Sequence, residues 1–167
     1  LEGLLRLFYA EHMVLFPRYF VAQTYGEYTI RRIMPSITFT HTSIDGRWSF
    51  HINGQGFRNE KEFSYERGDQ LRILCLGDSH TLGYEVDQNQ TFSAVLERYL
   101  LQRGYNAEVI NAGVSGYSNA EELIYLEQEG MKYQPQIVVV GFYTNDLEDN
   151  VRTGLFTLDE NDYLVAK

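Results

Sequence analysis

Three short apolar runs alternate with two amphipathic stretches between residues 71 and 141. The runs cover residues 71–76, 109–110 and 137–140, and their lengths suit strands better than helices. The last run has no polar residue, which is typical of a strand buried on both faces of a parallel sheet. Parallel strands need crossover connections, and the amphipathic stretches supply them. The chain is therefore predicted to have an α/β fold with right-handed crossovers.

The two amphipathic stretches carry the signals of helices. The first predicts a helix over residues 92–101, with Thr91 as its N-cap. A second helix is predicted over residues 119–129, where Ser118 and Glu121 have the spacing of a capping box. Apolar side chains recur at helical spacing in the first stretch, at Phe92, Val95, Leu96, Tyr99 and Leu100.

The first 70 residues predict an extension in front of the α/β domain. An apolar, partly amphipathic opening that stops at Pro17 predicts a short helix, which either packs on the domain or contacts a membrane or a partner. Residues 37–42 and 47–52 flank an Asp-Gly pair and predict a β-hairpin. A polar linker follows at residues 59–69. We therefore divide the chain into an N-terminal extension, residues 1–69, and an α/β domain, residues 70–167.

Composition excludes several classes of protein. The chain is 44% apolar and 22% charged, as in globular domains. One cysteine, Cys75, and four histidines far apart in the sequence predict neither a disulfide nor a metal site. No apolar run is long enough to cross a bilayer. Residues 71–167 hold 15 acidic and 6 basic side chains, so we expect no nucleic-acid partner.

A polar, glycine-containing turn follows each predicted strand. The turns occupy residues 77–81, 111–116 and 141–146. The carboxyl ends of parallel strands gather at one edge of an open sheet, so we expect the three turns to meet there. A serine at a tight strand-to-helix turn exposes its hydroxyl, and its N–H, a glycine N–H and an asparagine amide can together bind an oxyanion. These are the groups that acyl transfer needs.

The three turns resemble the motifs of the SGNH hydrolases, the GDSL-type esterase and lipase superfamily. Ser79 in Gly-Asp-Ser matches the nucleophile, Gly116 in Asn-Ala-Gly-Val-Ser-Gly-Tyr matches the second-block glycine, and Asn145 in Thr-Asn-Asp matches the third-block asparagine. The resemblance covers about residues 70–150. It implies a three-layer, flavodoxin-like fold and a serine esterase or O-acyltransferase that needs no cofactor and no metal.

A second resemblance concerns the extension. Residues 53–58, Asn-Gly-Gln-Gly-Phe-Arg, are similar to bacterial members of this superfamily that carry an N-terminal extension, often after a membrane anchor. This resemblance implies a periplasmic or membrane-proximal location, with membrane contact only through the extension. It also makes an ester, or an acylated carbohydrate, the expected substrate.

Two departures from the family pattern bear on activity. Tyr143 stands where the third block usually has glycine, as it does in some extended bacterial members. The last block, Asp-x-x-His, is not found in the 22 residues after Asn145, so we expect the sequence to be truncated before it. His80 is adjacent to the nucleophile but is expected to point elsewhere, and the other histidines precede the nucleophile, at positions 12, 41 and 51. A serine without a general base is a poor nucleophile, so the chain is expected to be inactive as given.

The missing histidine leaves a second function open. The chain could be a non-catalytic SGNH-like structural subunit of a membrane-associated assembly, docked through its aromatic extension. Three other α/β families are excluded by residues. No Gly-Lys-Ser/Thr and no Gly-x-Gly-x-x-Gly follows the first strand, and His80 stands where a haloacid-dehalogenase-like phosphatase has a second aspartate.

Each site residue also has a structural interpretation. Ser79 can simply cap the helix that follows it, although the context of Gly116 and Asn145 favours an active-site role. Cys75, within an apolar strand, is expected to be a core residue. Four further residues are expected to support the turns: Asp78, Thr81, Asn111 and Asp146.

The strand from Ile137 to Phe142 is predicted to have an uncovered outer edge if the family strand order applies. Neither charge nor proline blunts this edge, so something must cover it. We expect a further part of the polypeptide, missing from this sequence, or a protein partner. The short hairpin predicted from residues 155–158 and 163–165 is a weaker candidate.

Overall fold

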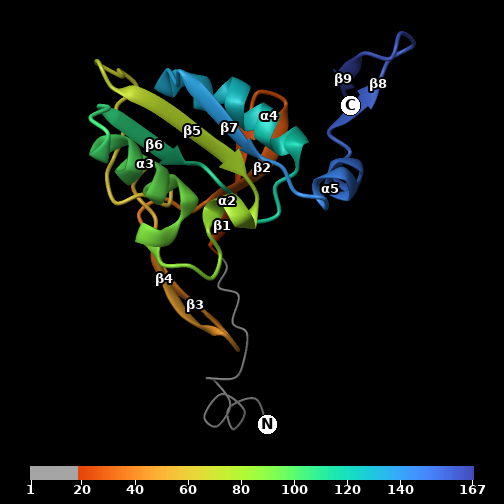
Figure 1. Ribbon diagram of the computed structural model, residues 1–167. Helices are drawn as coiled ribbons and strands as arrows, with labels where there is room; N and C mark the ends of the chain where they lie inside the picture. Colours follow the sequence, from red (N-terminus) through yellow and green to blue (C-terminus); the bar gives the residue numbers. More distant parts are fainter. Residues whose placement is uncertain (1–18) are drawn as a thin grey trace, which may run out of the picture.

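The computed structural model describes residues 19–167. Its centre is a parallel sheet of three strands in the order β6-β5-β7 (Figure 1). The strands are β5 (Leu71–Gly77), β6 (Ala107–Asn111) and β7 (Ile137–Gly141). This sheet and its helices confirm the predicted α/β, flavodoxin-like fold. The helix predicted before Pro17 lies outside the described residues.

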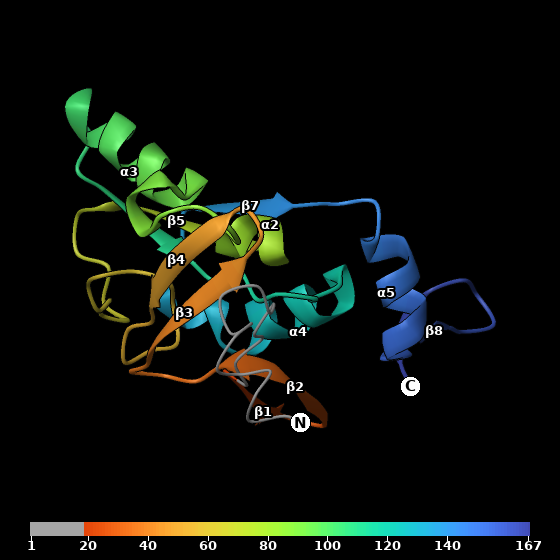
Figure 2. The same cartoon turned by 90° about the horizontal axis from the view of Figure 1, so that it is seen from below.

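Helices lie on both sides of the sheet (Figures 1 and 2). α3 (Phe92–Gln102) and α4 (Asn119–Gln128) have nearly the predicted bounds. Their predicted caps are present, because the Thr91 hydroxyl accepts from the Ala94 N–H and Ser118 forms a capping box with Glu121. The remaining helical segments are α2 (Ser79–Leu82), η1 (Gln88–Gln90), η2 (Gly130–Tyr133) and α5 (Asp146–Thr153).

Within residues 19–167, three antiparallel hairpins accompany this α/β unit. β3 (Thr38–Ser43) with β4 (Gly46–His51), and β8 (Phe156–Leu158) with β9 (Leu164–Ala166), confirm the two predicted hairpins. The hairpin of β1 (Phe20–Tyr25) and β2 (Tyr28–Ile33) was not predicted. The sequence does contain a signal for it, the glycine at position 26 in the two-residue turn, which adopts a φ of +59° in the structure. Figure 1 shows α5 and β8–β9 beyond the edge of the sheet.

The core is unequal on the two sides of the sheet. On one side, side chains of β5 and β6 join α4 and both N-terminal hairpins in a single large cluster. On the other side the structure shows a small cluster of buried residues, Ile73, Cys75 and Val109, with Leu96 and Leu100 of α3 packed against it. The rest of the apolar stripe of α3 is largely in solvent: Phe92, Val95 and Tyr99 are each at least 40% exposed. The extension therefore shares its core with the α/β part.

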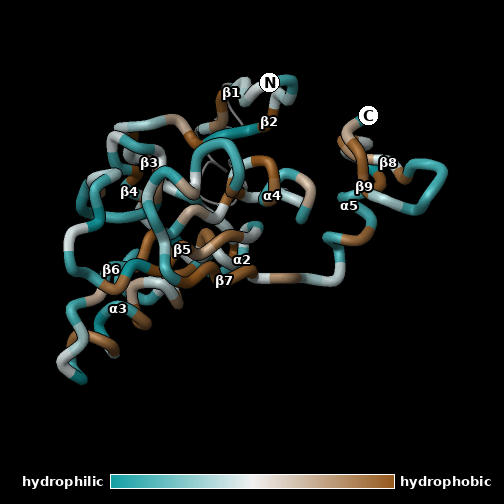
Figure 3. The backbone as a smooth tube through the Cα atoms, turned by 90° about the horizontal axis from the view of Figure 1, so that it is seen from above, coloured by the Kyte–Doolittle hydropathy of each residue, from teal (hydrophilic) through white to brown (hydrophobic). Residues whose placement is uncertain are grey.

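β7 is not buried on both faces, so that prediction was wrong. Ile137 is 44% exposed and Val140 is 51% exposed, although Figure 3 shows β7 among the most hydrophobic segments. Within residues 19–167, β7 pairs with β5 alone and its outer edge has no partner strand. A strand without polar residues is hydrophobic, but how many of its faces are buried depends on which other elements pack against it.

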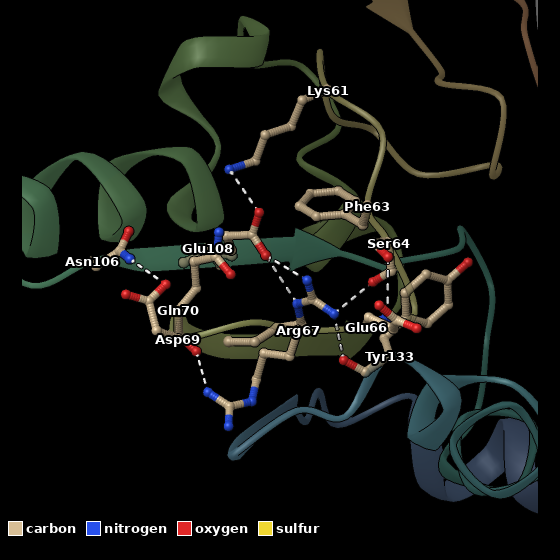
Figure 4. Close-up of polar contacts among 12 residues, drawn as sticks. Lys61, Phe63, Ser64, Glu66, Arg67, Asp69, Gln70, Asn106, Glu108 and Tyr133 are labelled. Carbon is tan, nitrogen blue, oxygen red and sulfur yellow. Dashed lines mark hydrogen bonds and ion pairs between the residues drawn. The ribbon is translucent and has the colours of Figure 1, made fainter.

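As predicted for a linker, residues 59–69 form neither helix nor strand. They are nevertheless held against the sheet by hydrogen bonds and ion pairs. Buried Arg72 of β5 pairs with Glu108 of β6 at 2.6 Å and donates to the Ser64 and Tyr133 carbonyls at 2.7 Å. Figure 4 shows Lys61 and Glu108 directed toward each other, with Nζ and Oε1 3.8 Å apart. The segment therefore closes the amino-terminal edge of the sheet, opposite the predicted site.

No helix in the part of the chain described by the structure is long and apolar enough to span a membrane.

Candidate active site

The three strand-end turns meet around α2. Thr81 of α2 is buried, and its side chain fills the space that a Cβ at Gly77 or Gly141 would need. The Gly113 Cα likewise lies against the backbone of Leu82. Glycines at the ends of all three strands therefore let α2 sit directly on the carboxyl edge of the sheet.

Ser79 is the first residue of α2. The Asp78 carboxylate caps this helix, since its Oδ1 accepts a hydrogen bond of 2.8 Å from the His80 N–H. The His80 ring lies 3.1 Å from the same oxygen and packs on Tyr143 of the third turn, with 4.2 Å between the ring centroids. The first and third turns are thus in contact, and Ser79 stands between the strand end and the helix with its side chain partly exposed.

Gly116 lies in the second turn with a φ of +76°, a conformation that favours glycine. Asn111 supports this turn by accepting a hydrogen bond from the Gly113 N–H at 3.1 Å, and the Val114 N–H donates to the Gly77 carbonyl at 3.0 Å. Among residues 19–167, the backbone N–H groups of Ser79 and Gly116 have no hydrogen-bond acceptor. Two free amides are therefore available for an oxyanion.

Asn145 immediately precedes α5, and its side chain is used within that helix. Its Nδ2 donates to Asp149 at 2.9 Å, and its buried Oδ1 has no partner among the described residues. Buried Asp146 accepts from the Tyr143 N–H at 2.8 Å and so closes the third turn. The structure brings together the three turns, whereas the convergence of the Ser79, Gly116 and Asn145 groups on one oxyanion stays a prediction.

Several carboxylates lie close together behind the carboxyl edge of the sheet. Glu122 of α4 is 2% exposed, and burial together with the charges of Asp146 and Asp78 raises its pKa to about 7. Burial also raises the pKa of Asp146. The Asn119 Nδ2 joins the two, at 3.1 Å from Glu122 and 3.5 Å from Asp146. Sequence reasoning missed Glu122 and Asn119, because no local pattern shows that α4 turns these positions toward α5.

The histidines of the described region have other partners. The His51 ring lies 3.2 Å from the Thr38 hydroxyl, and the His41 ring lies 3.3 Å from Glu85 and packs on Tyr84. Within residues 19–167, no histidine forms a hydrogen bond with the Ser79 hydroxyl, and no group of histidine, cysteine and acidic side chains has the arrangement of a metal site. Cys75 is fully buried, and burial raises the pKa of its thiol to about 12.

Two cavities differ in their relation to Ser79. A cavity of about 590 Å³ lies between residues 58–61 and α3, away from the three turns. A smaller, mostly apolar cavity of about 330 Å³ adjoins the carboxyl ends of β5 and β7, where Leu76, Val140 and Phe142 line it together with Glu122 of α4. Ser79 lines neither cavity, but the smaller one lies at the same edge of the sheet as the candidate site.

Comparison with known proteins assigns this arrangement to a family. Residues 75–164 match the GDSL-like lipase/acylhydrolase family model. An arylesterase of Vibrio mimicus is 31% identical over 75 residues, which are 45% of this chain and 38% of that protein. The esterase TesA of Pseudomonas aeruginosa is 32% identical over 74 residues, which are 44% of this chain and 37% of that protein.

A solved structure of AlinE4, an esterase of the SGNH-hydrolase family, has 36% sequence identity and a TM-score of 0.43, with 50% of this chain and 45% of that chain covered. The chain thus spans less than half the length of these relatives. The family model begins in β5 and ends in β9, and so covers all three turns and more than half of the chain. This chain therefore belongs to the GDSL-like lipase/acylhydrolase family.

Proposed function

We propose that this chain carries the nucleophile and the oxyanion-binding groups of a serine ester hydrolase or O-acyltransferase. The observation that carries the proposal is the packing of α2, which begins at Ser79, against the glycines of the three strand-end turns. The backbone N–H groups of Ser79 and Gly116 have no acceptor among the described residues, which supports it. Support also comes from the esterase names of the relatives.

In the proposed reaction the Ser79 Oγ attacks the carbonyl carbon of an ester, and the carbonyl oxygen becomes an oxyanion. The N–H groups of Ser79 and Gly116 donate to that oxygen. Asn145 joins them once its amide leaves Asp149. The apolar cavity beside Phe142 holds the acyl chain, and an acylated carbohydrate is a candidate substrate. We propose a periplasmic or membrane-proximal location, which the likeness of residues 53–58 to extended bacterial members implies.

A general base must take the proton of Ser79, and we propose that residues 1–167 by themselves do not supply one. The expected source is an Asp-x-x-His block elsewhere in the natural polypeptide. A correctly placed base contributes on the order of a hundredfold to ten-thousandfold in rate, so the 167-residue chain should have little serine-dependent activity.

Hydrolysis of p-nitrophenyl acetate tests both parts. We expect the 167-residue chain and its Ser79→Ala variant to have rates within about tenfold of each other. The natural polypeptide in its full length should lose at least about a hundredfold on the same substitution. A large serine-dependent rate in residues 1–167 would show that the chain contains its base. Equal rates for both full-length forms would reject Ser79 as the nucleophile.

A second proposal uses the exposed edge of β7. We propose that a further segment of the polypeptide or a protein partner covers Ile137 to Phe142, because apolar side chains at an open strand edge favour strand addition. This edge is also the observation that favours the alternative function, a non-catalytic subunit of a membrane-associated assembly. A serine-dependent esterase rate in the full-length polypeptide would exclude that alternative.

A further inference from the structure

The N-terminal extension reaches the candidate active site through one arginine. Arg31 lies in β2, in the hairpin that was not predicted. Its Nη2 donates to the Gly116 carbonyl, and the Tyr117 hydroxyl donates back to the Arg31 carbonyl. Two reciprocal hydrogen bonds therefore join β2 to the turn that carries the second oxyanion amide, across 85 positions of sequence.

The guanidinium also lies directly against Gly116. A Cβ at this position would be 2.9 Å from Nη2 and 3.2 Å from Nη1 of Arg31, so the cation covers one face of the glycine. Tyr117, the other partner of β2, is 1% exposed and cannot shift without opening the core. The hydrogen bond to the Gly116 carbonyl therefore restrains the backbone on one side of this residue, while its N–H on the other side stays free.

The charge of Arg31 matters because its surroundings are acidic. The side chain is exposed, and its charge lowers the pKa of Glu121 against the larger raising effect of burial. Asp78, Glu122 and Asp146 lie behind the same edge of the sheet. In the absence of Arg31, a negative charge that develops beside Gly116 would meet these carboxylates with less positive charge nearby to balance them.

We infer that Arg31 is a positioning residue of the oxyanion site, which fixes the backbone around Gly116 so that its N–H keeps a donating orientation, and which places a positive charge beside the developing oxyanion. The inference rests on the proposed function. It makes the extension a part of the site rather than a separate appendage, and it predicts a preference of the site for tetrahedral anions over neutral molecules of the same shape.

The test measures binding and needs no general base. Dimethylphosphinate is a tetrahedral monoanion with the shape of the intermediate formed from an acetate ester, and dimethyl sulfone is its neutral counterpart. Titration of each into the ¹⁵N-labelled chain, followed by NMR, should shift the amides of Ser79 and Gly116 with the anion and much less with the sulfone.

Substitution then separates positioning from general stability. Arg31→Met should weaken phosphinate binding roughly fivefold or more, and Arg31→Lys should recover part of it, because lysine keeps the charge and one donor. Arg103→Met is the matched control, since Arg103 is an exposed arginine of the α3 end that stacks on Tyr99. This control should bind like the unchanged chain.

Two outcomes would overturn the inference, and they are distinguishable. If Arg31→Met binds dimethylphosphinate as well as the unchanged chain and keeps the Gly116 amide shift, Arg31 does not position the site. If the unchanged chain shows no anion-dependent shift at Ser79 or Gly116, the proposed oxyanion site itself fails, and the role of Arg31 fails with it. Thermal unfolding of each variant shows whether the fold is retained.

Discussion

The two faces of the central sheet have comparable apolar side chains but very different covers. Leu74, Leu76 and Ile110 on one face are at most 1% exposed beneath α4 and the two N-terminal hairpins. Ile73, Cys75 and Val109 on the other face depend on one stripe of α3. The extension therefore acts as a structural layer of the domain. We expect substitutions beneath this layer to cost more stability than substitutions beneath α3.

Removing a side chain from the extension should have the largest effect. Phe50 of β4 is fully buried, stacks on Phe39 and lies 3.8 Å from the guanidinium carbon of Arg58. Phe50→Ala should lower the free energy of unfolding by about 3–5 kcal/mol, because it leaves a cavity in the larger core. Urea denaturation measures this. A loss below about 1 kcal/mol would show that the extension is only loosely attached.

The second prediction concerns Glu122, a buried carboxylate of α4, the helix that covers the well-covered face. The pKa of Glu122, raised from 4.5 to about 7, means that folding favours its neutral form. Its contribution to stability is complete below pH 4.5 and is lost as the pH rises through 7. Glu122→Gln should therefore flatten the fall in stability between pH 5 and pH 8 by up to about 3 kcal/mol.

Urea unfolding at both pH values checks this prediction. Glu127→Gln, an exposed position of the same helix, is the matched control and should leave the pH dependence unchanged. An unchanged pH dependence in the Glu122 variant would mean that this carboxylate is solvated and that α5 does not close over it.

A smaller effect is expected on the thinly covered face. Leu96→Ala on α3 should cost roughly 1–2 kcal/mol, because Leu96 is only partly buried against the smaller cluster. The adjacent Val95 is 41% exposed, so Val95→Ala should change stability by less than about 0.5 kcal/mol. A loss from Leu96→Ala as large as that from Phe50→Ala would abolish the contrast between the faces.

The smallest effect on stability is expected at the edge strand. Val140→Lys should change the free energy of unfolding by no more than about 0.5 kcal/mol, since Val140 is 51% exposed, but a charge at the edge should reduce self-association. Sedimentation velocity measures the association. Hydrogen exchange complements it: weak protection of the Val138–Val140 amides relative to β5 supports an uncovered edge, and strong protection in a monomer contradicts it.

Much of the fold follows from local patterns in the sequence. The three central strands and the helices α3 and α4 appear as runs and periodicities, since period and capping depend only on nearby residues, whereas α5 was not predicted. The three polar turns after the strands were also predicted, because parallel strands place their carboxyl ends at one edge. The hairpin around residues 45 and 46 was recognisable from its turn chemistry.

Tertiary structure alone decided the rest. Nothing local shows that the faces of β7 stay partly exposed, because exposure depends on which layers lie over a strand. The raised pKa of Glu122 arises from burial beside Asp146 and Asp78, which are distant in sequence. The contact of Arg31 with Gly116 likewise joins two segments whose proximity depends on the packing of a hairpin against α4. Charges and contacts act through space, whereas a sequence pattern records only neighbours along the chain.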